Sequence, residues 1–459
     1  MSRARLSGLD ASFLALETPT AHMHVGWVAI FAAAADGGLP DFSQLRAHIE
    51  GRIGRAPRYR QKLARVPLGL TAPEWVDDED FSIERHLYQA PGPLPGLVDE
   101  VMSMPLRRGR PLWELWVCEE PDSKRFAVIG KAHHCMVDGI AAVELGSMLL
   151  DPTPECGAAE EAPWRPGPEP GGKQLLLRGL LDGVVGQLGL VRMPVRAALS
   201  PARAARQGAA GAIRVAKALG HSLGAAAPPS ALNQSLSPLR HLAWAERPLA
   251  DLRTVKGTYH TTLNDVMLAA VAGGIRTYLA DRGERPAPLK AMVPVSLRSS
   301  KDELGNHTSF VFAELPCHNP EPLSRLSRVH ETMSALKRDR EPEGADLALK
   351  AAEHTPVAIQ HAISKLMASP RTFNLVVSNI PGPPQPLYLR GCPLQAIYPV
   401  VPLADRHTVS VGMTTVAERA CFGVYADREA FPDAERLARS INEAITELLE
   451  SAQRSGGSG

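Results

Sequence analysis

The chain has 459 residues, of which 44 % are hydrophobic and 22 % are charged. This is ordinary globular usage, and it excludes a chain disordered throughout, a collagen and a coiled coil. Fifty Lys and Arg residues balance 49 Asp and Glu residues, giving a formal net charge of +1. Such a balance argues against a protein built mainly to bind nucleic acid, because neutralising phosphates needs a basic surplus.

The cysteines and the apolar stretches indicate the cellular compartment in which the protein is expected. The chain has six cysteines and no Cys-x-x-Cys pair, which argues against a zinc ribbon and a thioredoxin-type motif and favours free thiols in a reducing compartment. The N-terminus has no apolar signal-peptide core. Apolar stretches such as Val266–Ile275 fall far short of the ~18 residues that a membrane span needs. We therefore expect a cytoplasmic protein that at most lies on a membrane surface.

Residues 1 to about 155 predict a mixture of strands and helices. The expected strands are Trp27–Ala33, Leu112–Cys118 and Phe126–Ala132, and the expected helices are Phe42–Ile53 and Gly139–Leu150. The next stretch, residues 160–172, is dense in Pro, Glu and Gly, which is typical of a linker.

Residues 173–224 differ in composition from the rest of the chain. They hold eight Lys or Arg residues against one acid, Asp182, among many Leu, Val, Ala and Gly residues. A basic amphipathic segment of this kind can lie on an anionic membrane. The alternative is a pair of surface helices that bridges two domains. Pro194 and Pro201 argue against one long helix.

The second half, from about residue 239, again alternates strands and helices. We expect helices at Leu263–Leu279 and Asp433–Leu449, and strands at Lys290–Val295, Thr308–Leu315, Thr372–Val377 and Cys421–Tyr425. A turn is expected at residues 378–383. Together these patterns predict an N-terminal domain at 1–160, a linker and basic segment at 161–235, a C-terminal domain at 236–454 and a flexible tail at 455–459.

The segment with the clearest chemical content ends the strand predicted at Phe126–Ala132. There His133 and His134 are followed by Asp138 and Gly139, and a helix is expected next. A histidine at a strand end can project into a cleft, and its near-neutral pKa suits proton abstraction from an alcohol. Asp138 can fix a histidine tautomer or pair with an arginine elsewhere. Gly139 gives the turn conformational freedom.

Other interpretations of these residues stay open. A His-His pair can be two hydrogen-bonded core histidines, or metal ligands, although neighbours on a strand point to opposite faces. A serine hydrolase would need Gly-x-Ser-x-Gly, and the nearest run, around Ser410, lacks the first glycine. A P-loop near-match at residues 167–174 ends in Gln174 where Ser or Thr is required.

His-His-x-x-x-Asp-Gly after a strand resembles the active-site motif of CoA-dependent acyltransferases. The rest of the chain resembles the bacterial wax ester synthase/diacylglycerol acyltransferase family. The similar motifs follow the family's order from residue 6 to about 435: Leu6–Leu14, His22–Gly26, Arg110–Glu114, Thr262–Val266, Val293–Arg298, Gly305–Asn306 and Ser378–Pro383.

The resemblance implies roles for individual residues. His134 is expected to be the general base that lets a hydroxyl attack an acyl-CoA thioester directly, without an acyl-enzyme. Asn264 is the candidate oxyanion donor, with a plain helix N-cap as its alternative. Asp138 is expected to pair with Arg298 and to shape the loop. His133 and Gly139 are expected to support the structure of the site, and Ser378 and Asn379 are expected to contact substrate.

The resemblance also implies an α/β fold of two chloramphenicol-acetyltransferase-like sandwich domains, with the active-site channel at their interface. The expected partners are acyl-CoA as a substrate and diacylglycerol or a fatty alcohol, together with a membrane or lipid-droplet surface. No resident cofactor, metal or nucleic acid is expected. Two other functions remain: an acyltransferase for a small or carrier-bound acceptor, and a non-catalytic lipid-binding relative.

Overall fold

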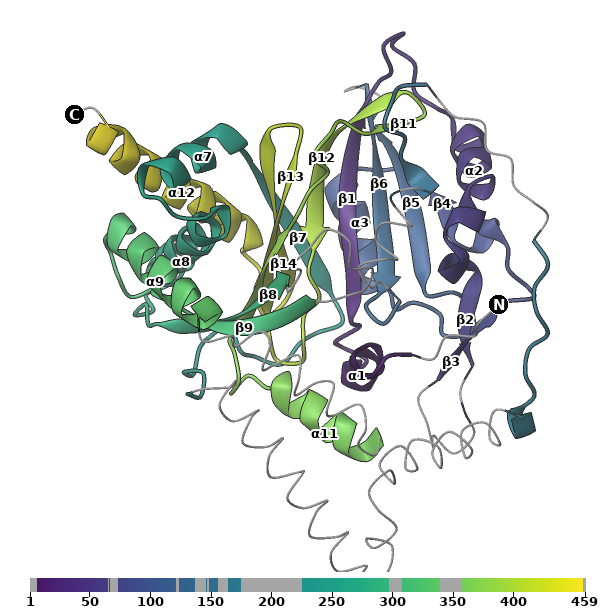
Figure 1. Cartoon of the computed structure of the whole chain (residues 1–459), viewed down its shortest axis with the longest axis horizontal. Coiled ribbons are helices and arrows are strands. Elements are labelled where there is room, and N and C mark those ends of the chain that lie inside the picture. Colours follow the sequence, from purple (N-terminus) through teal and green to yellow (C-terminus); the bar gives the residue numbers. More distant parts are fainter. Residues whose placement is uncertain are drawn as a thin grey trace, which may run out of the picture.

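The computed structural model describes residues 6–64, 66, 73–120, 124–136, 146, 148–155, 164–174, 225–296, 308–338 and 357–456. In this part of the chain, two six-stranded sheets face each other, and helices cover their outer sides (Figure 1). A separate two-stranded ribbon pairs β2 (Gln61–Ala64) with β3 (Glu74–Asp77).

The first sheet has the strand order β11-β12-β1-β6-β5-β4. Its strands are β1 (His24–Ala32), β4 (Leu87–Gln89), β5 (Trp113–Glu120), β6 (Arg125–His133), β11 (Tyr388–Leu389) and β12 (Cys392–Val400). The second sheet has the order β7-β14-β13-β10-β8-β9. Its strands are β7 (Arg240–Pro248), β8 (Leu289–Ser296), β9 (Thr308–Leu315), β10 (Leu375–Ile380), β13 (Val409–Val416) and β14 (Arg419–Asp427).

Most helices lie on the two sheets, and two lie near one end of both sheets (Figure 1). The first sheet carries α2 (Phe42–Glu50), and α3 (Leu94–Ser103) packs against both β6 and β7. The second sheet carries α7 (Leu249–Thr258), α8 (Leu263–Asp281), α9 (Pro322–Arg338) and α12 (Ala434–Gly456). Near one end of both sheets lie α1 (Gly8–Leu16) and α11 (Val357–Met367), which contact each other. Short 3₁₀ helices occupy Ile53–Arg55, Pro57–Arg60 and Ile83–Arg85.

The strand β12 connects the two halves of the fold. It belongs to the C-terminal half of the chain but pairs antiparallel with β1 in the first sheet. Its Pro399 lies directly on Gly412 of β13 and Gly423 of β14, and a Cβ added to Gly423 would stand 2.0 Å from the Pro399 carbonyl oxygen. Two glycines therefore permit the close approach of the sheets. The first sheet is thus built from both ends of the sequence, whereas the predicted division at residues 160 and 236 follows the chain alone.

Most of the predicted strands and helices are present within a few residues. The prediction of Thr308–Leu315 matches β9, and Leu263–Leu279 matches α8. The strand predicted at Thr372–Val377 is wrong in its bounds, because β10 begins at Leu375 and includes Ser378 and Asn379. Its parallel pairing with β13 extends the ladder to Ile380, and Pro381 follows. The helix predicted at Gly139–Leu150 and most of segment 173–224 lie outside the described residues.

Part of the predicted linker is docked on the first half of the fold. The Trp164 ring lies under the Arg60 guanidinium at 5.0 Å and edge-on to Phe81. Further along, the Gly167 N–H donates to Asp77 at 2.9 Å. Although its composition is typical of a free linker, this stretch is held by a cation–π contact and backbone hydrogen bonds.

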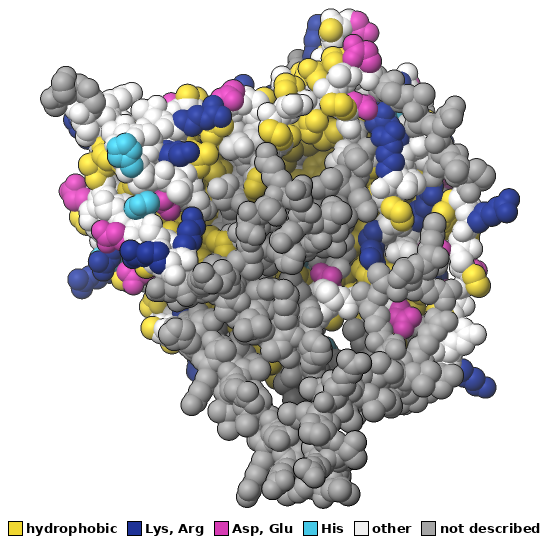
Figure 2. Space-filling model, in the orientation of Figure 1, with side chains coloured by type: hydrophobic (Ala, Val, Ile, Leu, Met, Phe, Trp, Pro, Cys, Tyr) yellow, Lys and Arg dark blue, Asp and Glu magenta, His cyan; other side chains and the backbone are white. Residues whose placement is uncertain are grey.

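The described surface shown in Figure 2 mixes cationic and anionic side chains over the helices that cover the second sheet. This agrees with the even overall charge. Within the described residues, no helix is long and apolar enough to cross a bilayer.

A histidine links α3 of the first half to the second sheet. The His241 Nδ1 lies 2.7 Å from Asp99, and its Nε2 lies 2.7 Å from Glu435 on α12. The hydrogen bond to Asp99 is the main cause that raises the pKa of His241 above its ordinary value of 6.5. A raised folded-state pKa stabilises the protein fully below 6.5, and this contribution disappears as pH rises through the folded-state pKa.

We expect the substitution His241→Gln to remove this pH dependence. The free energy of unfolding of the wild type relative to that of the variant should fall by on the order of 1 kcal/mol as pH rises from 6.5 to 9, as measured by urea unfolding. The buried histidines with lowered pKa values raise the stability of both proteins equally over this range, because their unfolded forms lose protons, so they cancel in the difference. They are His22, His24, His48, His86, His133, His134 and His407. Parallel curves for the two proteins would contradict the assignment.

Candidate functional site

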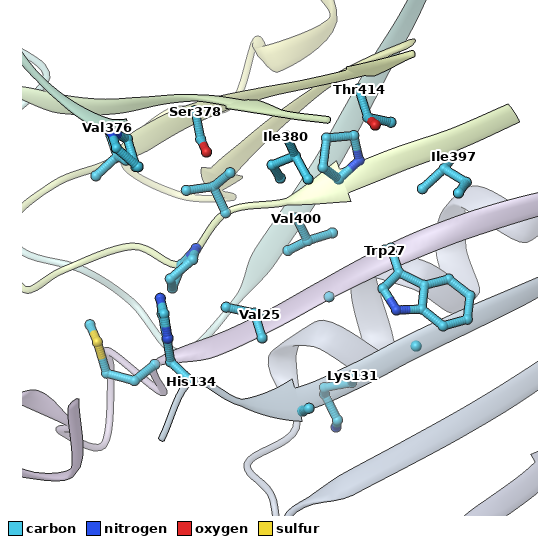
Figure 3. Close-up of a pocket in the computed structure, with 18 of the residues that line it drawn as sticks. Val25, Trp27, Lys131, His134, Val376, Ser378, Ile380, Ile397, Val400 and Thr414 are labelled. Carbon is cyan, nitrogen blue, oxygen red and sulfur yellow. The ribbon is translucent and has the colours of Figure 1, made fainter. Parts of the chain in front are cut away.

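A cavity of about 680 Å³ lies between the two sheets in the described structure. Side chains of β1, β6, β10 and β12 line it (Figure 3). Residues of α1 and α11 also contribute to its lining. Its walls are mostly aliphatic and aromatic. A site of this shape suits a long alkyl chain, because each buried methylene contributes about 0.8 kcal/mol.

His134 reaches this cavity because of its position just after β6. Alternate residues of a strand point to opposite faces, so Ala132 and His134 face the cavity whereas His133 faces away. The His134 backbone N–H donates to the Met23 carbonyl at 2.9 Å, which holds the end of β6 against the start of β1.

The imidazole of His134 is enclosed but open to the cavity. Its face stacks on the Phe13 ring of α1, with centroids 3.7 Å apart and planes inclined by 12°. Burial lowers the pKa of His134 to about 4, so the ring is neutral at pH 7. A neutral imidazole at the edge of an apolar cavity is able to accept a proton from a bound hydroxyl group.

His133 lies behind the cavity and holds the turn that follows β6. Its Nδ1 accepts the Cys135 N–H at 3.1 Å, so Nε2 carries the proton. That Nε2 lies 3.8 Å from the carboxylate of Glu17, which pairs with Arg108. Burial, followed by the positive charge of Arg108, lowers the pKa of His133 to about 3. His133 is therefore a neutral, buried donor that faces the Glu17–Arg108 pair.

The two residues predicted to contact substrate point in different directions. Ser378 lines the cavity with its β10 neighbours Val376 and Ile380 (Figure 3). Asn379 is not among the lining residues, since the alternation along β10 directs it to the opposite face. The Gly382 that follows the strand packs on the backbone of Thr415, where no side chain would fit.

Asn264, the candidate oxyanion donor, lies in the first turn of α8. Thr262 is the N-cap of α8, and its side chain forms a reciprocal capping box with Asp265, so the alternative role of Asn264 as N-cap is wrong. Asp265 also accepts from His330 of α9 at 2.8 Å. The start of α8 is thus anchored toward α9, and Asn264 is not among the residues that line the cavity.

Three predicted site residues lie outside the described residues. They are Asp138, Gly139 and Arg298, so the expected Asp138–Arg298 ion pair remains a prediction. Among the described residues, no three His, Cys, Asp or Glu side chains are placed to hold a metal ion.

The alternative nucleophiles do not fit covalent catalysis. The Ser410 hydroxyl lies within β13 and donates to the Val401 carbonyl at 2.7 Å. Cys135 adjoins His134, but burial raises the pKa of its thiol. Among the described residues, no hydroxyl group hydrogen-bonds to the His134 ring. In the described site, the candidate base His134 therefore has no nucleophilic side chain hydrogen-bonded to its ring.

Sequence inspection gave no role to several residues that shape the site. Phe13 stands in the similar N-terminal motif, but its stacking on His134 depends on the placement of α1. Trp27 follows His24-Val-Gly26, and its indole lies against Gly130 of β6, where an added Cβ would stand 2.3 Å from the ring. The buried Lys131 pairs with Glu114 at 3.1 Å and donates to two carbonyls of the α3 region. For Trp27 a usable signal was present in the sequence: the alternation of side chains along its strand would have placed it on the cavity side.

Family models match both halves of the chain. The wax ester synthase/diacylglycerol acyltransferase catalytic domain matches residues 6–267, and the C-terminal domain of the same family matches residues 304–449. The chain belongs to the wax ester synthase/diacylglycerol acyltransferase family. The predicted resemblance is thus confirmed.

Relatives in this family are similar along their whole length. The chain is 33 % identical over 464 residues to the probable diacylglycerol O-acyltransferase tgs1 of Mycobacterium tuberculosis H37Rv, covering 98 % of this chain and 96 % of the relative. It is 31 % identical over 454 residues to the probable diacylglycerol O-acyltransferase tgs2 of the same strain, covering 96 % and 97 %.

Solved structures confirm the predicted fold class. The wax ester synthase/diacylglycerol acyltransferase of Marinobacter aquaeolei VT8 matches with a TM-score of 0.70 at 27 % identity, covering 98 % of this chain and 100 % of that one. The trichothecene 15-O-acetyltransferase of Fusarium sporotrichioides matches with a TM-score of 0.61 at 12 % identity, covering 97 % and 95 %. The family member described here thus has the two-domain, condensation-domain-like architecture.

Proposed function

We propose that the protein transfers a long-chain acyl group from acyl-CoA to the hydroxyl group of diacylglycerol, a fatty alcohol or both. The observation that carries this proposal is the neutral His134 imidazole at the edge of an apolar cavity of about 680 Å³. The relatives named as diacylglycerol O-acyltransferases support the choice of acceptor.

His134 acts as the general base of a direct transfer. The acceptor oxygen bonds to the thioester carbonyl carbon as its proton passes to the His134 ring. The carbon–sulfur bond then breaks, and the imidazolium returns the proton to the CoA thiolate. The products are an ester and free CoA, and no acyl-enzyme forms. Holding both substrates in one cavity supplies a large part of the rate.

One assay tests this proposal against its alternatives. Purified protein is mixed with palmitoyl-CoA, with and without dipalmitoylglycerol or hexadecanol, and both thiol release and ester are measured. We expect thiol release that depends on the alcohol and equals the ester formed. Thiol release without alcohol would indicate a thioesterase. Activity only with small or carrier-bound acceptors, or none at all, would favour the other acyltransferase or a lipid-binding protein.

Ser378 is our candidate donor to the carbonyl oxygen in the transition state. Its hydroxyl group faces the cavity across from His134 (Figure 3). This hydroxyl group forms no hydrogen bond with another described residue. We expect Ser378→Ala to lower kcat roughly 100-fold, as loss of an oxyanion donor does, with little change in KM. A kcat within threefold of wild type would contradict this role.

Trp27 should limit the length of chain that the cavity accepts. It stands on β1 between Val25 and Phe31, which line the same cavity as His134. We expect Gly130→Ala to push the indole into the cavity and to lower kcat/KM about fourfold for each methylene it excludes. A series of acyl-CoA and alcohol chain lengths measures this effect. Trp27→Ala should restore long chains in the double variant, and an unchanged length profile would refute the assignment.

The acceptors dissolve in lipid, so we also place the enzyme on the cytoplasmic face of a membrane or on a lipid inclusion. On α11, Ile363 and Met367 line the cavity, while Leu366 is 54 % exposed. Sedimentation with diacylglycerol-containing vesicles tests this location. Binding by wild type but not by Leu366→Glu is expected, and equal recovery in the supernatant would oppose it.

A further inference from the structure

Among the described residues, the imidazole of His134 has no carboxylate partner of the kind that usually assists a histidine base. In a Ser-His-Asp triad, a carboxylate orients the ring and stabilises the imidazolium that forms during the reaction. The His134 Nδ1 is buried, and no residue in the described part of the chain hydrogen-bonds to it. Among the described residues, no carboxylate forms an ion pair with this ring. Within the described part of the site, a different group contacts the ring and can fix its plane.

The group that contacts the ring face is Phe13. Its ring is nearly parallel to the imidazole, with centroids 3.7 Å apart, and both rings line the same cavity. The helix that carries Phe13 is anchored at both ends. Ser7 caps its start by accepting the Asp10 N–H at 3.0 Å. Just after its end, Glu17 pairs with Arg108 and donates its N–H to the Phe13 carbonyl.

An aromatic ring can do two of the things that a carboxylate does. Stacking removes the freedom of the imidazole to rotate. The negative face of the ring also attracts a cation within about 6 Å, and the attraction is strongest in a site without water. This attraction is absent while the imidazole is neutral and appears as it takes up the proton. It therefore stabilises the transition state more than the ground state.

We propose that Phe13 is a positioning residue for the proposed acyl transfer: its ring holds the His134 imidazole in the reactive orientation and stabilises the imidazolium formed during proton abstraction. The inference rests on the proposed function, and it assigns to an aromatic face the role that a carboxylate has in a triad.

Several ionisable groups surround this pair of rings. They are Asp10 and Glu17 at α1, Glu114 on β5, His133 and Lys131 on β6, Cys135 after it, and Arg108 beyond His133. Burial is the largest cause of the lowered pKa of His134, and none of these charges is among its causes. A change at Phe13 that alters only the electron density of its ring therefore isolates the contribution of the ring.

The test uses the full-length enzyme with phenylalanine analogues at position 13 that carry one to five fluorine atoms. Fluorine withdraws electron density from the ring face with little change in shape. We expect kcat to fall stepwise with fluorine number, roughly 10- to 30-fold in total, with KM unchanged. The acid limb of the kcat profile should move to lower pH, because the imidazolium loses stabilisation. Phe13→Leu should lose as much activity, and Phe13→Tyr should retain most of it.

Phe431→Leu is the matched control. Phe431 is a buried phenylalanine stacked on Tyr278, with centroids 4.5 Å apart, in the helical layer away from the cavity. This variant should lose stability but keep kcat and the pH profile. A kcat independent of fluorine number in an active enzyme would overturn the role of Phe13 alone. A wild-type protein without alcohol-dependent ester formation would overturn the proposed function, and this inference with it.

Discussion

We expect His134→Ala to lower kcat for ester formation by roughly 10³- to 10⁴-fold, as removal of a general base does. The folded protein should be unaffected, because the His134 side chain makes no hydrogen bond to a described residue, and its backbone N–H bond to Met23 remains. Thiol release from palmitoyl-CoA with hexadecanol measures the loss, and thermal unfolding verifies the fold.

Two outcomes separate this explanation from a structural one. His134→Gln keeps the approximate size of the side chain and its stacking surface but cannot accept the proton, so it should be as inactive as His134→Ala. If either variant retained turnover within tenfold of wild type, His134 would not be the base.

We expect Gly423→Ala to lower the free energy of unfolding by about 3 kcal/mol, the upper end of overpacking effects. The new methyl group would stand 2.0 Å from the Pro399 carbonyl oxygen. Both atoms belong to strands whose pairing fixes them, so β12 must move away from the second sheet. Because β12 lines the cavity, activity should fall with stability. Urea unfolding and the thiol-release assay measure the two effects.

Gly257→Ala is the control for this substitution. Gly257 lies in α7, and an added Cβ there meets no atom within 4 Å. Alanine in a helix is favoured over glycine by about 0.5–1 kcal/mol, so this variant should be slightly more stable than wild type. Equal stabilities of the two variants would show that the sheets do not require Gly423.

Local signals in the sequence predicted the base and its strand. The β-rich run before His133 and His134 is continuous in sequence, so the strand, its end and the direction of its side chains follow from neighbouring residues. Ser378 was predicted to lie in a turn, but it lies in the strand β10, where its side chain faces the cavity. The parallel partner of β10, which extends the ladder through Asn379, lies more than thirty residues further along the chain.

The features that sequence could not predict depend on long-range packing. Asn264 fits a helix start chemically, but the cap is Thr262, Asp265 binds His330 of α9, and Asn264 is not among the residues that line the cavity. The contact between Phe13 and His134 joins residues 121 positions apart. The pairing of β12 with β1 has no local signature at all, because either sheet would accept a strand of that composition.

The placement of β12 has a consequence for biosynthesis. The first sheet cannot be completed until residues 392–400 have left the ribosome. One edge of the strand β1 therefore stays unpaired while most of the chain is synthesised. Contacts this distant in sequence slow folding and leave an exposed edge that other chains can join. We therefore expect a polypeptide that stops before residue 392 to aggregate rather than to fold as an independent N-terminal half.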